Sequence, residues 1–352
     1  MNQTFSHQGA AMPDRVVVIN GVPHLYFSGT AYLCMNHNAA FTRLLEEGMQ
    51  LYGTNYGSSR SGNFTLPVYE QTEKALAERL HAEATLTISS GFMAAQLVIR
   101  FYEGTGTFMY APDSHPALLR TKQDYYTGSF ENWATQLPEK IAAVADDRII
   151  LVCNSIDPLK AAYHDFSWID QLPGNKSILL IVDDSHGLGI TGKNGEGIYA
   201  GIKDRAPIDS IVVSSLGKAM GIPGGIILSN RHTINQLRTS PYFTAASPIA
   251  PAYLYACLQG EAIYEQERKQ LRENIIYFQG GLQQVSGFRH IENYPVIYCM
   301  RNELAGFLLE QNILISSFAY PTPADGIITR IVLNSHHRKE DMDTLLRFLK
   351  DQ

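Results

Sequence analysis

One lysine, Lys218, stands among small residues in the stretch Ser214-Ser-Leu-Gly-Lys-Ala-Met-Gly-Ile-Pro-Gly-Gly225. Apolar runs at 210–214 and 225–229 flank this stretch. Lysine usually stays at a protein surface, because an ammonium group is costly to remove from water. When a lysine is buried, its pKa falls and the neutral amine can attack a carbonyl group. A surface loop is the better interpretation of Lys218 alone, and a reactive amine needs support from other residues.

A second polar group, Asp183-Asp184-Ser185-His186, closes the apolar run 177–182. The run predicts a strand, and in open α/β sheets ligands bind at the carboxyl ends of the strands. Two carboxylates at such a place are costly without a positive partner. The residues alone leave three interpretations open: a turn that one aspartate caps, a metal site made by Asp183 and His186, or a site for a cationic cofactor.

Two strand-to-helix junctions carry further polar residues. Asp113-Ser114-His115-Pro116 has the pattern of a helix N-terminus, with proline in the first turn and His115 as an additional feature. Ser90, Gly91 and Phe92 begin another helix, where free N–H groups and a glycine would suit a phosphate. An ordinary N-cap is the simpler explanation of this second junction if it stands alone.

The glycines at 187–192 match the G-x-G-x-x-G pattern of dinucleotide-binding proteins. In that pattern the third glycine opens a helix. Here the chain continues Lys-Asn-Gly-Glu-Gly, which cannot start one. We therefore do not expect a nicotinamide cofactor.

The elements that must position these residues alternate between strand and helix from about residue 67 to 230. Strands are predicted at 84–89, 106–112, 148–154, 177–184, 210–214 and 225–229, and helices at 67–83, 91–102 and 116–125. Strands that are apolar throughout indicate an α/β fold with a mostly parallel sheet covered on both faces. Beyond Pro248 we expect one long helix or two in sequence, then a small α+β unit. Asn20-Gly21 predicts a hairpin near the N-terminus.

The composition excludes several classes of function. The chain of 352 residues has a net charge of −6 and no long run of Lys or Arg, which argues against binding to nucleic acid. Its four cysteines are scattered, so we expect reduced thiols, a cytoplasmic location and no zinc or other metal site. No signal peptide is expected, and no apolar run approaches the roughly 20 residues of a membrane span.

Pyridoxal 5'-phosphate would use all of these features together. Its aldehyde needs an amine, its phosphate an anion site and its ring nitrogen a carboxylate. Lys218, the helix start at 90–92 and Asp183 would supply the three. His115 could stack on one face of the ring, and His186 could reach the ring hydroxyl.

Six segments resemble, in the same order, those of the α-oxoamine synthases, a family of fold-type-I pyridoxal-phosphate enzymes. The segments are 52–80, 87–96, 113–119, 181–197, 214–225 and 329–337. The resemblance implies an N-terminal segment (1–45), a large cofactor-binding domain (46–245), and a linking helix with a small C-terminal domain (246–352). It also implies a C-acyltransferase that condenses a small amino acid, L-alanine, with an acyl thioester, releasing CO2 and the free thiol.

The resemblance assigns roles residue by residue. Lys218 matches the Schiff-base lysine, Asp183 the ring-nitrogen aspartate, and His115 and His186 the histidines beside the ring. Ser90, Gly91, Phe92, Ser155 and Ser215 fall at cofactor-binding positions. Thr244 matches a residue that reaches the phosphate from a partner subunit, which implies a homodimer with shared active sites. Arg330 matches the arginine that pairs with the amino-acid carboxylate, a role suited to its bidentate fork.

The substrate-facing parts depart from the family pattern. Thr30 replaces an asparagine that helps to hold the carboxylate, Tyr69 replaces a histidine, and the segment 151–158 lacks the family's acidic residue and last glycine. An enzyme that uses glycine or serine, an aminotransferase or decarboxylase on the same scaffold, and a non-catalytic relative therefore stay open. The thioester carrier, coenzyme A or an acyl carrier protein, is also open.

Overall fold

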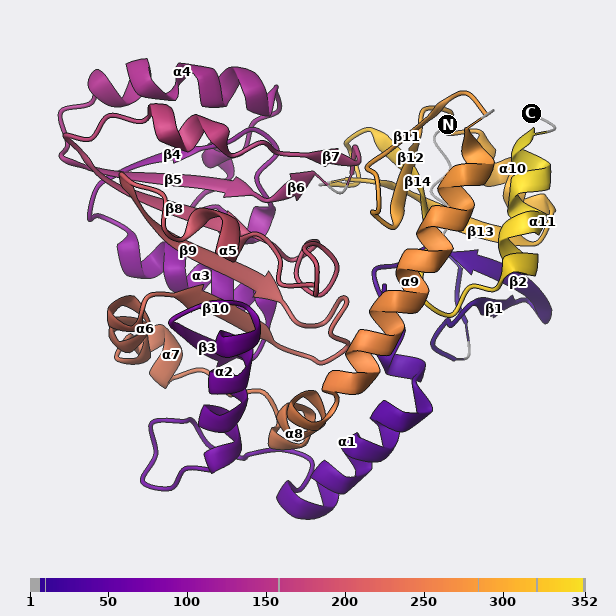
Figure 1. Cartoon of the computed structure of the whole chain (residues 1–352), viewed down its shortest axis with the longest axis horizontal. Coiled ribbons are helices and arrows are strands. Elements are labelled where there is room, and N and C mark those ends of the chain that lie inside the picture. The colour runs from indigo at the N-terminus through magenta and orange to yellow at the C-terminus, as the bar shows by residue number, and fades with distance from the viewer. Residues whose placement is uncertain (1–6, 10, 158, 284, 321, 351–352) are drawn as a thin grey trace. The chain divides into compact units, whose positions relative to one another are not determined.

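The computed structural model describes residues 7–9, 11–157, 159–283, 285–320 and 322–350 (Figure 1). These residues form two units. The larger unit comprises residues 39–157 and 163–261, and the smaller unit is made from the described parts of 1–38, 158–162 and 262–352.

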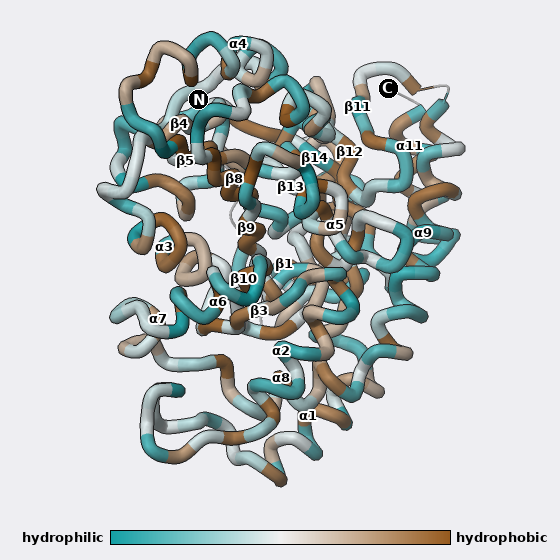
Figure 2. The backbone as a smooth tube through the Cα atoms, turned by 60° about the vertical axis from the view of Figure 1, so that its left-hand side comes forward, coloured by the Kyte–Doolittle hydropathy of each residue, from teal (hydrophilic) through white to brown (hydrophobic). Residues whose placement is uncertain are grey.

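A six-stranded sheet forms the centre of the larger unit. Its strand order is β3 (Ala84–Ile88), β10 (Gly225–Ser229), β9 (Ile208–Ser215), β8 (Ser177–Asp183), β5 (Arg148–Asn154) and β4 (Thr107–Tyr110). Strands β4, β5, β8 and β9 run parallel, and β10 is antiparallel to both of its neighbours. The central strands have apolar, buried middle parts with polar residues at their ends (Figure 2), as expected for a sheet buried on both faces. The predicted α/β class and mostly parallel sheet are confirmed.

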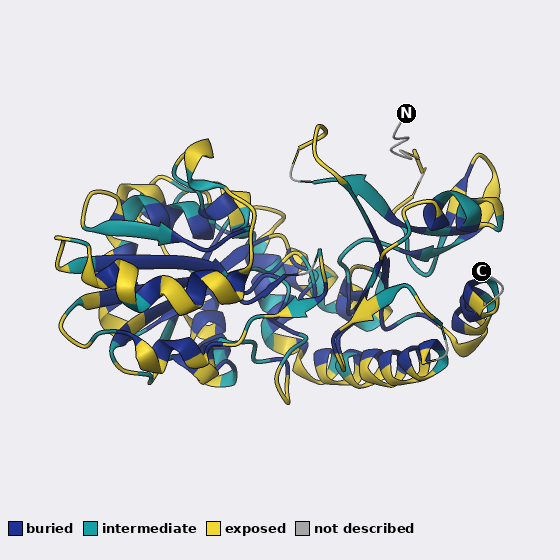
Figure 3. Ribbon diagram, turned by 90° about the horizontal axis from the view of Figure 1, so that it is seen from above, coloured by how far each residue is buried: buried dark blue, intermediate teal, exposed yellow. Residues whose placement is uncertain are grey.

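Helices α3 (Gly91–Tyr102) and α6 (Arg231–Arg238) cover one face of this sheet. Every second residue of the strands packs against them, for example Ile150, Ile181 and Val213. The other elements of the larger unit are α1 (Ala39–Tyr52), α2 (Pro67–Arg79), α4 (Phe130–Ala142), α5 (Tyr199–Ile202), α7 (Pro241–Thr244), α8 (Pro251–Gln259) and a 3-10 turn at Ser167–Gln171. Figure 3 shows the central strands buried and the outer turns of the helices exposed.

A buried ion-pair network holds α2 against the sheet. The Glu73 carboxylate accepts hydrogen bonds from Arg60, Arg238 and both the N–H and the hydroxyl of Thr87. Burial alone would raise the pKa of Glu73, but the hydrogen bond and charge of Arg60, with the charge of Arg238, hold it below its ordinary value. Tyr69, at the position where the family has a histidine, is buried beneath the Arg60 guanidinium. This network fixes the segment that leads into α2.

The smaller unit is a second sheet built from both ends of the chain. Its strand order is β1 (Val16–Ile19), β2 (Val22–Phe27), β13 (Ile313–Ala319), β14 (Ile327–Val332), β12 (Val296–Cys299) and β11 (Phe288–His290). The β2–β13 pair is parallel, and the other pairs are antiparallel. Helices α9 (Glu261–Leu282), α10 (Leu304–Glu310) and α11 (Lys339–Lys350) complete it. Strands β6 (Ile156–Asp157) and β7 (Ala162–Tyr163) form a separate two-stranded sheet.

The structure confirms one local prediction and corrects another. Asn20 and Gly21 both have positive φ, as a tight hairpin turn between β1 and β2 requires. The helix predicted at 116–125 is wrong, because this segment forms two 3-10 turns, Pro116–Leu118 and Lys122–Asp124. Thr121 begins the second turn, where local hydrogen bonds to Asp124 compete with a continuous helix.

None of the helices in the described ranges is both long and apolar enough to cross a membrane.

Candidate active site

The carboxyl ends of β5, β8 and β9 meet at one edge of the larger sheet. Asn154 pairs with Asp183, and Asp183 pairs with Val213, two residues before the end of β9. Side chains alternate between the faces of a strand, so Asp183 and Ser215 project from the same face as the residues that contact α3. The strand ends therefore bring Asp183, Ser215 and the start of α3 together.

Lys218 lies in the turn between β9 and β10. Its Nζ is 2.8 Å from Nε2 of His186, and its side chain is half-buried. Backbone hydrogen bonds from Leu216 to Gly224 and from Ile222 to Leu216 close the turn. This geometry places His186 beside the lysine amine, and its predicted contact with the ring hydroxyl stays a prediction.

The Asp183 carboxylate is buried and divides its contacts between two residues. Its Oδ1 accepts the N–H of Ser185 at 2.8 Å, and its Oδ2 lies 3.8 Å from Nδ1 of His115. The turn-capping interpretation is therefore correct for one oxygen. The other oxygen faces His115 at the sheet edge.

His115 is held as a neutral ring. Burial lowers its pKa, and the charge of Lys218 adds to this effect while that of Asp183 opposes it. Its Nδ1 accepts the N–H of Ala117 at 3.2 Å, which places the ring proton on Nε2. The side chain is still 41% exposed, so one part of the ring is available to a ligand.

Asn154 fixes the loop that carries His115, and sequence reasoning missed it. Its Oδ1 accepts the N–H of His115 at 3.0 Å, and its Nδ2 donates to the carbonyl of Asp113 at 2.8 Å. Asp113 has a φ of 56°, a conformation that asparagine and aspartate adopt more readily than most residues. One signal in the sequence could have found it: Asn154 is the last residue of a predicted strand, as Asp183 is near the end of another.

The start of α3 approaches the end of β9 very closely. A Cβ on Gly91 would come within 2.7 Å of the Ser215 Cβ, so only glycine fits there. Ser90 caps the helix, its Oγ accepting the N–H of Met93 at 3.1 Å. The first N–H groups of a helix have no partner within it and attract anions. Phe92, in this first turn, is 61% exposed.

Asp184, directly after Asp183, supports the site from behind. It is fully buried, and its carboxylate accepts the Ser155 hydroxyl at 2.5 Å and the Ile198 N–H at 2.9 Å. A Cβ on Gly187 or Gly197 would come within 2.1 Å of one of its oxygens. Gly187, the first glycine of the apparent dinucleotide motif, therefore lies against the Asp184 carboxylate together with Gly197, and Ser155 is engaged with Asp184.

The other predicted site residues lie further along the chain. Thr244 ends α7, is half-buried and donates to the carbonyl of Pro241 at 3.4 Å. Thr30 and Arg330 belong to the smaller unit, where Thr30 is half-buried. Arg330 is buried in β14, and its guanidinium carbon lies 5.4 Å from the ring centre of Phe318. Their predicted roles toward the substrate remain predictions.

The larger unit fits pyridoxal 5'-phosphate. It presents an amine paired with a histidine, a buried carboxylate and an exposed ring beside them. The start of α3 suits the phosphate, because its first N–H groups have no partner within the helix and Gly91, which has no Cβ, lets the helix lie close to β9. Among known proteins, the model of the family "Aminotransferase class I and II" matches residues 25–349. The chain belongs to this family. Its cofactor is pyridoxal 5'-phosphate, and it is a member of the α-oxoamine synthases, a group of C-acyltransferases.

The curated relatives agree with this assignment. The 8-amino-7-oxononanoate synthase of Petrotoga mobilis is 28% identical over 346 residues, which cover 93% of this chain and 88% of the relative. That of Serratia proteamaculans is 28% identical over 357 residues, covering 96% and 91%. Among members of the family, segment 52–60 also most resembles 8-amino-7-oxononanoate synthase.

Solved structures share the fold. A serine palmitoyltransferase from S. paucimobilis superposes with a TM-score of 0.84 at 18% identity, covering 98% of this chain and 92% of that one. The 8-amino-7-oxononanoate synthase of Francisella tularensis gives a TM-score of 0.71 at 20% identity, covering 93% and 97%.

Proposed function

We propose that this enzyme joins a small amino acid, L-alanine, to an acyl thioester, with loss of CO2 and release of the free thiol. The observation that carries the proposal is the 2.8 Å contact between Lys218 and His186 beside the buried Asp183. An amine at this edge, with a second basic group in hydrogen-bond reach, suits the movement of a proton at the amino-acid Cα. The name of the curated relatives supports condensation as the reaction.

When bound, pyridoxal 5'-phosphate supplies a ring that accepts the electrons left at the amino-acid Cα. Asp183 would hold a proton on the ring nitrogen, and neutral His115 would stack on the ring. The Ser90-Gly91-Phe92 helix start and Ser215 would bind the phosphate. Lys218 would move the Cα proton, with His186 exchanging a proton across their hydrogen bond.

We further propose that Arg330 binds the amino-acid carboxylate and that Thr30 lies beside it. Thr244 would reach the phosphate of a partner subunit, so the active enzyme is a homodimer with shared sites. The scattered cysteines support a cytoplasmic location.

The relatives' name would also place the enzyme in biotin synthesis. That placement depends on one property of the acyl thioester, a carboxylate at the far end of its chain.

The test is an assay of thiol release. Purified protein with pyridoxal 5'-phosphate is mixed with alanine, glycine or serine and with acyl-coenzyme A or an acylated carrier protein. We expect thiol release that requires both substrates and is fastest with alanine. Lys218→Ala should reduce it by about 100-fold or more, and Lys218→Arg should not restore it, because a guanidinium stays protonated. Formation of an oxo acid without thiol would instead identify an aminotransferase.

A further inference from the structure

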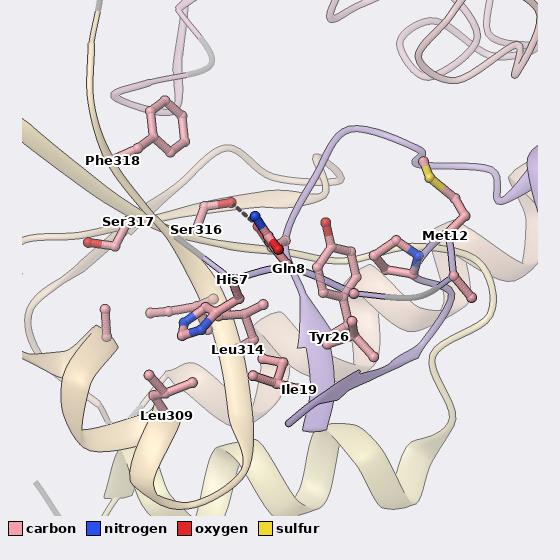
Figure 4. A pocket seen from close by; sticks show the side chains of 17 residues that line it. His7, Gln8, Met12, Ile19, Tyr26, Leu309, Leu314, Ser316, Ser317 and Phe318 are labelled. Atoms are coloured by element: carbon pink, nitrogen blue, oxygen red, sulfur yellow. Dashed lines mark hydrogen bonds between the residues drawn. The ribbon is translucent and has the colours of Figure 1, made fainter. Parts of the chain in front are cut away.

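The smaller unit contains a cavity of about 590 Å³, within the range of ligand pockets. Residues 7–9 and 11–13, strands β1, β2 and β13, and helix α10 line it. Figure 4 shows Leu309, Leu314 and Ile19 close together on one side, with Ser316 and Phe318 on the other. Figure 4 also shows His7 near Leu309 and Gln8 beside Ser316, so one side is aliphatic apart from one imidazole, and the other carries hydroxyl and amide groups and an aromatic ring.

The cavity shares a sheet face with Arg330. Residues paired across a ladder project from the same face, and Arg330 is paired with Ser316. Leu314 and Phe318, two positions away along β13, project from that face as well. All three of these β13 residues line the cavity, and the Phe318 ring lies 5.4 Å from the guanidinium carbon of Arg330. A substrate whose carboxylate is bound by Arg330 would therefore lie beside Phe318 and the lining of the cavity.

The lining carries no permanent charge. Its 17 described residues include no Lys, Arg, Asp or Glu, and His7 and Tyr26 are its only titratable side chains. Its polar groups include the hydroxyls of Ser28 and Ser316, which lie 2.7 Å apart and hydrogen-bond to each other. Leu309, Leu314 and Ile19 offer a carboxylate neither a cation nor a hydrogen-bond donor, and an unpaired carboxylate is costly to remove from water.

We infer that this cavity receives the acyl chain of the thioester and selects a chain with an uncharged end. This inference rests on the proposed function and deepens it by naming the acyl class. A carboxylate-ended chain, as the product name of the curated relatives requires, would place its charge against the aliphatic side chains of Leu309, Leu314 and Ile19. A plain aliphatic chain would bury its methylene groups there at a gain. The enzyme would then make an amino ketone without a carboxylate rather than an amino-oxo acid.

The experiment compares two thioesters of equal chain length, heptanoyl-coenzyme A and 6-carboxyhexanoyl-coenzyme A, with the complete enzyme and alanine. We expect kcat/KM from thiol release to be at least tenfold higher for the heptanoyl substrate. Equal values, or a preference for the carboxylate-ended chain, would overturn the inference while leaving the condensation intact. No thiol from either thioester with any amino acid would contradict the proposed function instead. In that case calorimetric binding of the same two thioesters decides the inference, and equal or tighter binding of the carboxylate-ended one overturns it.

A pair of variants tests whether the cavity is responsible. Leu309→Arg places a cation in the lining and should bring the ratio of the two kcat/KM values down by at least tenfold. Glu310→Arg places the same side chain on the exposed side of the same helix and should leave the ratio unchanged. If both variants change the ratio equally, the general charge of the protein and not the cavity sets the preference, and the inference fails.

Discussion

Two neighbouring aspartates support the site through different chemistry. Asp183 ends β8 on the side of α3 and faces His115, whereas Asp184 is enclosed by Gly187, Gly197 and Ser155. Burial raises the pKa of Asp184 to about 7, although the hydrogen bonds from Ser155 and the Ile198 N–H act in the opposite direction. This carboxyl group therefore gains a proton on folding over much of the acidic range.

The raised pKa predicts how Asp184→Asn changes stability. Between its ordinary pKa of 3.8 and about 7 the folded state holds a proton that the unfolded state releases, so the stability from this group falls as pH rises. The total over this window is at most about 4 kcal/mol. An asparagine can accept from the Ile198 N–H and donate to Ser155 without titrating. We expect denaturant unfolding to show a smaller loss of stability from pH 5 to pH 8 in Asp184→Asn. The exposed Asp209→Asn is the control, and an unchanged loss in the Asp184 variant would refute the assignment.

At the scale of elements, polar groups join segments that packing alone would leave loose. Asn154 ties the His115 loop to the end of β5, and the Gly91 approach fixes α3 against β9. Glu73 joins the segment around Arg60, helix α2, strand β3 and helix α6 in one network. Each of these contacts holds an element at the edge where the catalytic groups meet.

The Glu73 network predicts that the substitution Glu73→Gln lowers the free energy of unfolding substantially. Glu73→Gln removes the only described carboxylate that pairs with Arg60 and Arg238, leaving their charges without a counterion. Breaking a buried ion pair in this way costs about 3–5 kcal/mol. We expect that loss in the free energy of unfolding, measured with urea at neutral pH. Glu78→Gln, on the exposed side of the same helix, should change it by less than about 0.5 kcal/mol.

At the scale of the whole molecule, the two ends of the chain are joined in one sheet. The smaller unit pairs β2 with β13, and the Asp14–His336 and Arg15–Asp341 contacts, both at 2.7 Å, attach the N-terminal segment to the region after β14. The hydrogen bond to Asp14 raises the pKa of His336. The pKa of Asp14 is lowered: burial works against this, and the contact with His336 outweighs it.

The Asp14–His336 pair predicts a pH window of N-terminal attachment. The His336 contribution is full below about pH 6.5 and is lost as pH rises through its raised pKa, while the Asp14 contribution is lost as pH falls through its lowered pKa. Both groups are partly exposed, so the pair is worth about 1 kcal/mol or less. Limited proteolysis of the segment before β1 should be slower at pH 5.5 than at pH 8.5. His336→Gln should remove this difference and the exposed His232→Gln should keep it; a difference that persists in His336→Gln would count against the pair.

Sequence reasoning found the edge of the larger sheet because its signals are local. An apolar run followed by Asp183, or a glycine-bounded Lys218, is visible without knowing which strands are neighbours. The roles of Asn154 and Asp184 depend on strand order and on backbone approach, which no periodicity reports. The parallel pairing of β2 with β13 was missed for the same reason. The incorrect helix at 116–125 shows how side-chain hydrogen bonds around Thr121 override a helical pattern.

The pairing of β2 with β13 also limits when the smaller sheet can form during synthesis of the chain. Leu25 and its partner Ile313 are about 290 residues apart in sequence, and at roughly 5–20 residues per second their synthesis is separated by about 15–60 s. During that interval the β1–β2 hairpin has no third strand, and an isolated hairpin is at best marginally stable in water. The larger unit can meanwhile form its sheet from residues that have already emerged. Strands β1 and β2 are therefore synthesised long before β13, but they can join their sheet only after β13 has been made.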